Sequence, residues 1–141
     1  IYQTLVPVSC KKCALPYAVF VQTASEDSDD VAILQRLKSL LKQEEYKDKS
    51  LETIRFVNRE GCADCRKGVS GRTVVAEMLD PTSEILGALR ELNFENANRI
   101  WRSQGGISVL EHAIDKIFQG MIDPRFVEDS CGLLTDSLEE E

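Results

Sequence analysis

The sequence predicts a mostly helical α+β chain, in which a small knuckle-and-strand region with a helical insert precedes a cluster of short helices. Three observations lead to this fold class. Two cysteine pairs, at residues 10–13 and 62–65, flank a segment with helical periodicity, and runs typical of strands adjoin the second pair. Helix-capping signals then recur at short intervals after residue 80. At 141 residues, the chain is long enough to bury a hydrophobic core.

The segment between the cysteine pairs is predicted to contain one helix. Residues 14–25 include Pro16 and a short alternation of side chains, so we expect them to be irregular or extended. Asp27 or Ser28 then caps a helix that runs to about residue 46, because its apolar residues recur every three or four positions. The recurring apolar positions are Val31, Leu34, Leu37 and Leu41.

A strand is expected on each side of the second cysteine pair. Residues 51–57 alternate in the manner of a half-buried strand. Residues 73–79 are β-branched and apolar, which also favours a strand. The second cysteine pair is therefore expected in a loop between two extended segments.

The last part of the chain is predicted to form three or four short helices. Their start signals are Asp80-Pro81, Ser108 with Glu111, and Asp123-Pro124. Helical periodicity covers residues 83–92 and 95–103, and glycines at 105–106, 120 and 132 mark helix ends. The apolar side chains expected to form the core of this cluster are Leu89, Leu92, Phe94, Ile100, Trp101, Leu110, Ile114 and Phe118.

These elements suggest a division of the chain into three parts. Residues 1–79 form a tetracysteine subdomain whose helical insert covers about 27–47, and residues 80–132 form a C-terminal helical subdomain. Residues 133–141 end in three glutamates and are expected to be a disordered acidic tail. Because the chain opens with Ile1 inside an apolar phrase, we interpret it as part of a longer protein.

Composition argues against several classes of function. The net charge of −7 and the sequence pI of about 4.8 disfavour binding to nucleic acid. No run approaches the roughly 18 apolar residues of a membrane span, and no signal-peptide pattern opens the chain. The five cysteines fit a four-thiolate site with Cys131 as a small apolar bystander better than a secreted disulfide framework. We therefore expect a reducing, cytoplasmic compartment and no direct membrane insertion.

Cys10, Cys13, Cys62 and Cys65 are the candidate metal ligands. Each pair has the C-x-x-C spacing, and two such pairs supply the four thiolates of a tetrahedral zinc site. Four thiolates leave no open coordination position, so we expect structural rather than catalytic zinc. Two disulfides, free thiols, or iron and redox chemistry are the alternatives. Lysines and arginines in and after the pairs are expected to offset the negative charge of the thiolates.

Residues that could carry out catalysis are not gathered in any familiar pattern. The chain has no G-x-x-x-x-G-K-[ST] loop, no G-x-G-x-x-G and no H-E-x-x-H. We interpret the single histidine, His112, as a surface or core residue of a helix. Nothing assembles a nucleophile, a base and an oxyanion site, so we predict that this chain by itself is not an enzyme.

Two motifs with defined spacing make the chain resemble a known family. The first is Q-x-L-V-x-x-x-C-x-x-C-x-x-P-Y over residues 3–17, and the second is G-C-x-D-C-x-x-G-x-x-G-R-x-x-x-x-E over residues 61–77. Together with the glycine-punctuated helices that follow, they resemble the C-terminal, zinc-binding part of the type II secretion and type IV pilus assembly ATPases. The resemblance covers about residues 1–127.

The resemblance implies a place for this chain in a larger machine. In that family the ATP-binding core lies upstream, which agrees with the missing nucleotide-binding motifs. The chain would then be a non-catalytic subdomain of a hexameric motor, peripheral to the inner membrane on its cytoplasmic side. Its implied partners are the neighbouring subunits of the hexamer and the platform protein of the pilus or secretion system.

Two other functions compete with this interpretation. A stand-alone zinc-ribbon adaptor or nucleic-acid-binding module would use the same cysteines, but the acidic composition and the core spacing of the aromatics disfavour nucleic acid. A thiol oxidoreductase would place its C-x-x-C at the start of a helix in a βαβ setting, which the pattern does not show.

Overall fold

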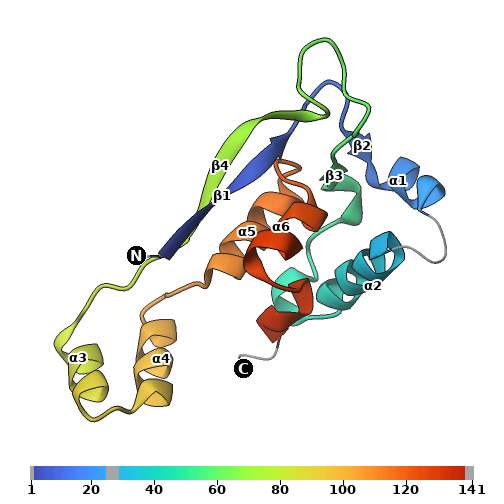
Figure 1. Cartoon of the computed structure of the whole chain (residues 1–141). Coiled ribbons are helices and arrows are strands. Elements are labelled where there is room, and N and C mark those ends of the chain that lie inside the picture. The colour runs from blue at the N-terminus through green and yellow to red at the C-terminus, as the bar shows by residue number, and fades with distance from the viewer. Residues whose placement is uncertain (1, 25–28, 139–141) are drawn as a thin grey trace.

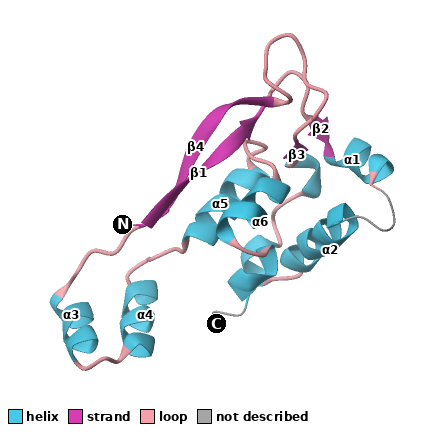
Figure 2. Ribbon diagram, in the orientation of Figure 1, coloured by secondary structure: helices cyan, strands magenta, loops and turns pink. Residues whose placement is uncertain are grey.

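A computed structural model describes residues 2–24 and 29–138 (Figure 1). The predicted fold class is confirmed, because the described residues form six helices and two small sheets, with a four-cysteine loop region at one end (Figure 2). The helices are α1 (Tyr17–Thr23), α2 (Asp29–Leu41), α3 (Ser83–Arg90), α4 (Phe94–Ser103), α5 (Val109–Phe118) and α6 (Pro124–Cys131). The strands are β1 (Tyr2–Ser9), β2 (Leu15–Pro16), β3 (Arg55–Phe56) and β4 (Val69–Glu77).

The longer sheet pairs β1 with β4 in antiparallel register, from Tyr2 opposite Glu77 to Ser9 opposite Val69. Strand β4 confirms the strand expected over residues 73–79, whereas β1 is absent from the sequence-based expectations. Helices α5 and α6 lie along one face of this ribbon (Figure 1). The two cysteine-bearing loops lie together at the end of the ribbon where β1 finishes and β4 begins.

The core lies where the β1–β4 ribbon, α2, α5 and α6 meet. Helix α2 contributes the Leu34 and Leu37 positions that the periodicity identified, and both are buried. The fully buried core residues from the other parts of the chain include Val6, Ile54, Phe56, Val75, Ile114, Ile117, Ile122 and Val127. Phe20 of α1 stacks on Phe56, with ring centroids 3.8 Å apart. The insert between the cysteine pairs is therefore packed into the same core as the C-terminal helices.

Short helices follow β4 as predicted, but they do not share the single core that was expected. Helices α3 and α4 pack on each other as a hairpin beyond the N-terminal end of β1, away from α5 and α6 (Figure 1). Two residues expected in the core are exposed there, Leu92 by 73% and Phe94 by 64%. Trp101 is half-buried, and its indole N–H donates to the carbonyl oxygen of Met78 at 2.8 Å. Periodicity identified the apolar stripe of each helix, but it carried no information on which helices share a core.

Two local expectations in the first half of the chain are also wrong. Residues 17–23 form helix α1 instead of an extended segment, because Pro16 starts the helix and Phe20 becomes buried on its inner face. Residues 51–57 hold only the two-residue strand β3 after a 3-10 turn, η2 (Leu51–Thr53). Helix α2 ends at Leu41, and the 3-10 turn η1 (Glu44–Tyr46) continues to the expected limit. Its predicted caps, Asp27 and Ser28, lie outside the described residues.

Capping signals located helix starts accurately in the C-terminal region. Ser108 and Glu111 form both hydrogen bonds of a capping box at α5. Asp123 caps α6, with Pro124 as its first helical residue and Gly132 at its end. For α3 the observed N-cap is Thr82, two positions after the predicted Asp80, because the Thr82 hydroxyl accepts from the Ile85 N–H.

The segment after α6 differs from the expected disordered tail where it is described. The 3-10 turn η3 (Leu134–Leu138) follows α6, and Leu134 is fully buried against the core. Its backbone N–H donates to Glu128 at 2.9 Å. Residues 139–141 lie outside the described part, and the division into subdomains stays a prediction.

Candidate metal centre

The first cysteine pair is held by backbone hydrogen bonds at the end of β1. The Ser9 N–H donates to the Met121 carbonyl at 3.0 Å, and the Cys10 N–H donates to the Gly68 carbonyl at 2.8 Å. The chain then turns sharply, because the Ala14 N–H donates back to the Cys10 carbonyl at 2.9 Å. These hydrogen bonds hold the backbone of Cys10 in place without the help of a metal ion. We call this loop, residues 10–13, the first knuckle.

The second knuckle, residues 62–65, is enclosed by backbone conformations that favour glycine. Gly61 has a φ of +71° and Gly68 a φ of +88°, in the left-handed region that side chains disfavour. A Cβ atom on Gly68 would lie 2.3 Å from the carbonyl oxygen of Asn58 and 2.6 Å from a methyl carbon of Val57. Gly68 therefore allows the chain that leaves the second knuckle to pack closely against residues 57–58, which lead into it.

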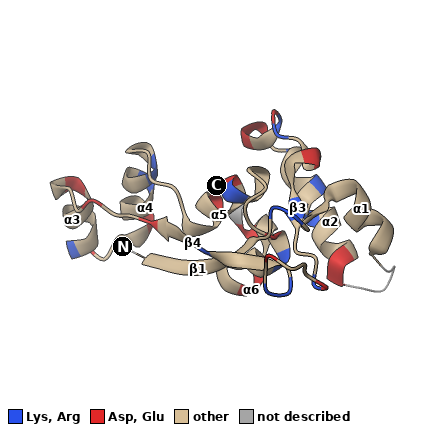
Figure 3. Ribbon diagram, turned by 90° about the horizontal axis from the view of Figure 1, so that it is seen from above, with Lys and Arg blue, Asp and Glu red and all other residues tan. Residues whose placement is uncertain are grey.

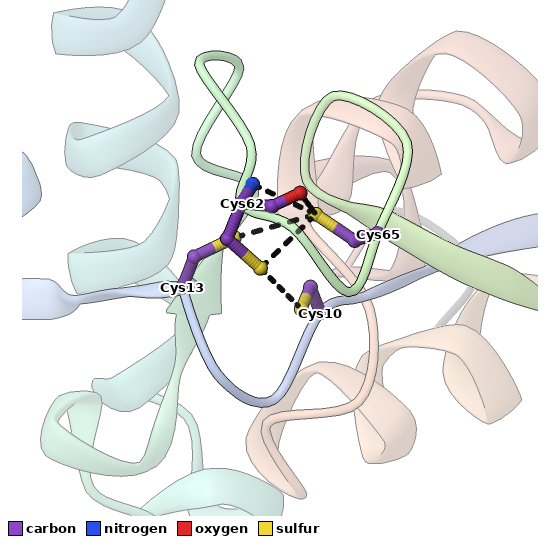
Figure 4. Close-up of side chains that lie close together, drawn as sticks. All are labelled: Cys10, Cys13, Cys62 and Cys65. Carbon is purple, nitrogen blue, oxygen red and sulfur yellow. Dashed lines mark hydrogen bonds between the residues drawn. The ribbon is translucent and has the colours of Figure 1, made fainter.

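The two knuckles bring all four predicted cysteines together (Figure 4). Their sulfur atoms all lie within 4.8 Å of one another, and the shorter separations are 3.6 Å for Cys13–Cys65, 3.6 Å for Cys62–Cys65 and 3.8 Å for Cys10–Cys62. A tetrahedron with zinc–sulfur bonds of about 2.3 Å has sulfur atoms about 3.8 Å apart. The four thiols are free, and these separations far exceed the bond of about 2.05 Å in a disulfide. The geometry fits one tetrahedral metal ion.

The thiols of the first knuckle differ in acidity. Backbone N–H groups of Cys13 and Lys12 point at the Cys10 sulfur and lower its pKa to about 7. Burial, together with the neighbouring sulfurs, raises the pKa of Cys13 to about 12. Four sulfurs packed this closely cannot all ionise without a compensating cation. The cluster thus has the property that makes a divalent metal bind strongly, since the ion stabilises every thiolate at once.

Cations gather on the two knuckle loops at one end of the long sheet (Figure 3). Lys12 of the first knuckle pairs with Asp64 of the second at 2.8 Å, and both side chains are exposed. This ion pair joins the two knuckles but is worth little in water. Lys11, Arg66 and Lys67 are exposed on the same loops, at the positions where charge compensation was predicted. The backbone N–H of Cys62 also donates to the sulfur of Cys65 at 3.2 Å.

The other residues singled out by the sequence have structural environments. The Nδ1 atom of His112 accepts from the Ala76 N–H at 3.0 Å, which ties α5 to β4. Cys131 is partly buried at the end of α6, and burial raises the pKa of its thiol. Among the described residues, the four cysteines are the one group of three or more potential metal ligands that lie together.

Three residues that support this region carried only a weak signal in the sequence. Glu77 ends the second motif, and its carboxylate accepts from the Val109 N–H at the start of α5 at 3.0 Å. Asp123 was identified as a helix cap, but it also accepts from the Val57 N–H at 2.7 Å. Arg125 donates to the Val57 carbonyl at 3.0 Å. Cap and motif patterns give the local role of such residues, and only the fold shows the distant backbone groups that they contact.

Fold and site together define an α+β protein that carries a cluster of four cysteines that could hold a metal ion. The family model described as "Type II/IV secretion system protein" matches residues 1–135. The chain therefore belongs to the type II/IV secretion system protein family, which is a family of ATPases. Comparison with curated proteins gave no match. None of the described helices is long and apolar enough to cross a membrane.

Proposed function

We propose that this chain is the zinc-binding C-terminal subdomain of a hexameric secretion or pilus-assembly motor ATPase. In this proposal it has no catalytic role of its own, and it works in the cytoplasm at the inner membrane through its parent complex. The observation that carries the proposal is the approach of the four sulfurs to within 4.8 Å of one another, with three separations of 3.6–3.8 Å, in a chain of the type II/IV secretion family.

Zinc is the metal we propose because four thiolates in a tetrahedral array are its common structural ligand set. Cys10, Cys13, Cys62 and Cys65 would all be ligands, leaving no position for water or substrate. The ion would hold together two loops separated by the 48 residues between Cys13 and Cys62. Closing a loop of that length restricts the unfolded chain, so metal binding stabilises the fold.

The proposed role of this closure is to present a rigid surface for assembly. The loop closed by the metal contains α1 and α2, and both pack into the core beside α5 and α6. A motor that changes shape during its cycle needs subdomains that move as units. We propose that the body in which α1, α2, α5 and α6 share one core serves this purpose, in contact with neighbouring subunits and with the inner-membrane platform protein.

The first test is elemental analysis of the purified chain, combined with thiol counting before and after chelation. The proposal expects one zinc per chain, four thiols released when the metal is removed, and a fifth, Cys131, that titrates independently of metal. Two disulfides and no metal would refute the zinc centre. Iron in place of zinc would retain the site and change the cofactor.

The second test addresses the role in the motor. In the full-length protein, Cys62→Ser combined with Cys65→Ser is expected to abolish zinc binding and to impair assembly of the pilus or secretion machine. Cys131→Ser is the matched control, because it removes a partly buried cysteine that is not in the cluster. Normal assembly by the double variant would show that the metal centre is dispensable for the motor.

A further inference from the structure

We propose that residues 121–125, called the clasp below, set the metal affinity of the four-cysteine centre by anchoring both knuckles. Asp123 and Arg125 would be positioning residues of the centre. The clasp begins before α6 and includes its first two residues. This inference rests on the proposed metal centre, and it assigns a function to a buried aspartate and its largely buried arginine partner, which lie outside the cysteine cluster.

The first knuckle is anchored through the backbone of the clasp. Val8 forms an antiparallel bridge with Ile122, and the Ser9 N–H donates to the Met121 carbonyl at 3.0 Å. Ser9 is buried, so this N–H has no water to replace the carbonyl if the clasp moves. Cys10 follows Ser9 directly. The position of the first ligand therefore depends on where the clasp lies.

The second knuckle is anchored through side chains of the clasp. Asp123 accepts from the Val57 N–H at 2.7 Å, and Arg125 donates to the Val57 carbonyl at 3.0 Å. The N–H and the carbonyl of Val57 are thus both hydrogen-bonded to one Asp–Arg pair. In a β-sheet, such backbone groups would instead bond to the backbone of a neighbouring strand. Val57 directly follows β3 and leads, five positions later, to Cys62.

The two anchored arms meet at Gly68. Its carbonyl accepts from the Cys10 N–H at 2.8 Å, and its α-carbon packs so closely on Val57 and Asn58 that a Cβ atom would not fit. A displacement of Val57 would consequently be passed to Gly68 and from there to Cys10, because packed backbone leaves no free volume to absorb it. Loss of the clasp should therefore loosen both halves of the metal centre together.

The Asp123–Arg125 pair is suited to this role because it is rigid. Asp123 is completely buried and pairs with Arg125 at 2.8 Å. The Arg125 guanidinium also lies over the Phe20 ring, with 4.9 Å between its central carbon and the ring centroid. Arg125 also lies 3.9 Å from Asp30, but removing the Arg125 charge would leave Asp123 buried without a cation beside it, so the arrangement tolerates few alternatives. Ligand positioning by residues beyond the metal ligands commonly changes metal affinity by about 10- to 100-fold.

The test measures the Zn²⁺ affinity of the full chain by competition with a chromophoric chelator. Asp123→Asn keeps the size of the side chain and an oxygen that can cap α6, but it loses the charge that pairs with Arg125. We expect it to weaken Zn²⁺ binding about tenfold or more. Loading with Co²⁺ should also change the absorption bands of the tetrahedral thiolate site, a spectroscopic effect that lower stability alone does not produce.

Arg36→Met is the matched control. Arg36 of α2 donates to Glu128 of α6 at 2.7 and 2.5 Å, so this variant also breaks a partly buried ion pair on the same helix. That pair bonds to neither Val57 nor Ser9. We expect the control to keep its Zn²⁺ affinity within about twofold of that of the unmodified chain, with an unchanged Co²⁺ spectrum. This should hold even if its melting temperature falls as much as that of Asp123→Asn.

The outcomes separate the two proposals. Failure of the unmodified chain to bind Zn²⁺ or Co²⁺ would overturn the metal centre, and the clasp with it. Normal binding by Asp123→Asn, or an equal loss in the Arg36→Met control, would overturn the clasp alone. If Asp123→Asn does not fold, Arg125→Lys replaces it, because lysine keeps the charge but lacks the planar fork that reaches Asp123 and Val57 together. A loss of affinity in that variant would support the clasp, and unchanged affinity would refute it.

Discussion

Substitution of Gly68 by alanine should destabilise the protein more than the same substitution at a glycine with nearly the same positive φ. Gly68 has a φ of +88° and Gly105 a φ of +89°, so both positions impose nearly the same strain on an alanine. A Cβ atom at Gly68 would lie 2.3 Å from the Asn58 carbonyl oxygen, whereas a Cβ atom at Gly105 meets nothing within 4 Å. The pair of variants therefore separates backbone strain from crowding at the metal centre.

The magnitudes follow from these two contributions. An alanine held in a left-handed backbone conformation lowers the free energy of unfolding by about 1–2 kcal/mol, and this cost applies to both variants. Crowding in a packed interior adds about 1–3 kcal/mol, and this cost applies only to Gly68→Ala. We expect a total loss of about 2–5 kcal/mol for Gly68→Ala and about 1–2 kcal/mol for Gly105→Ala. For a chain of this length the difference corresponds to a gap of about 3–9 °C in melting temperature.

Thermal unfolding followed by circular dichroism provides the assay, with protein and zinc concentrations held equal because bound metal raises the melting temperature. Zinc affinity should fall with stability for Gly68→Ala, since the Gly68 carbonyl accepts the Cys10 N–H. Gly105→Ala should bind zinc normally. Equal melting temperatures for the two variants would refute the claim that Gly68 is required by its close backbone contact.

Three further predictions concern other parts of the fold. In the reduced, metal-free protein, iodoacetamide labelling of Cys10 should rise at lower pH than labelling of Cys131, because the thiolate is the reactive form and the pKa is about 7 for Cys10 but raised by burial for Cys131. Peptide mass spectrometry would detect this order, and it would be contradicted if Cys10 labelling did not rise with pH through about 7. Glu77→Gln should cost about 1 kcal/mol in urea unfolding, since it removes the charged acceptor of the Val109 N–H at the positive end of α5. Leu134→Ala should cost about 2–5 kcal/mol, because Leu134 is fully buried, and a loss below about 0.5 kcal/mol would show that η3 does not pack in solution.

The candidate ligands could be predicted because their signal is local. Two residues between cysteines is the spacing that lets both sulfurs of a short loop point to one ion, and this property needs no knowledge of the rest of the fold. The same holds for the caps at Ser108 and Asp123, whose side chains bond to backbone N–H groups two or three residues away. Motif spacing likewise identified the family that the match over residues 1–135 then showed.

The failures share a physical cause, which is that they depend on distant partners. Strand β1 forms because β4 pairs with it across more than 60 residues of sequence. Residues 17–23 become a helix because Phe20 reaches Phe56. Helical periodicity in α3 and α4 gave no indication that the two helices would pair with each other, leaving Phe94 exposed.

The sequence by itself predicted the four candidate ligands, the starts of α5 and α6 and the family, since each rests on residues close together in the chain. Only the tertiary structure decided what holds the ligands in place. Asp123 and Arg125 are an ordinary helix start in the sequence, and they become the anchor of the second knuckle because folding brings Val57 within hydrogen-bonding distance. Such a contact depends on the packing of the whole core, which no local pattern encodes.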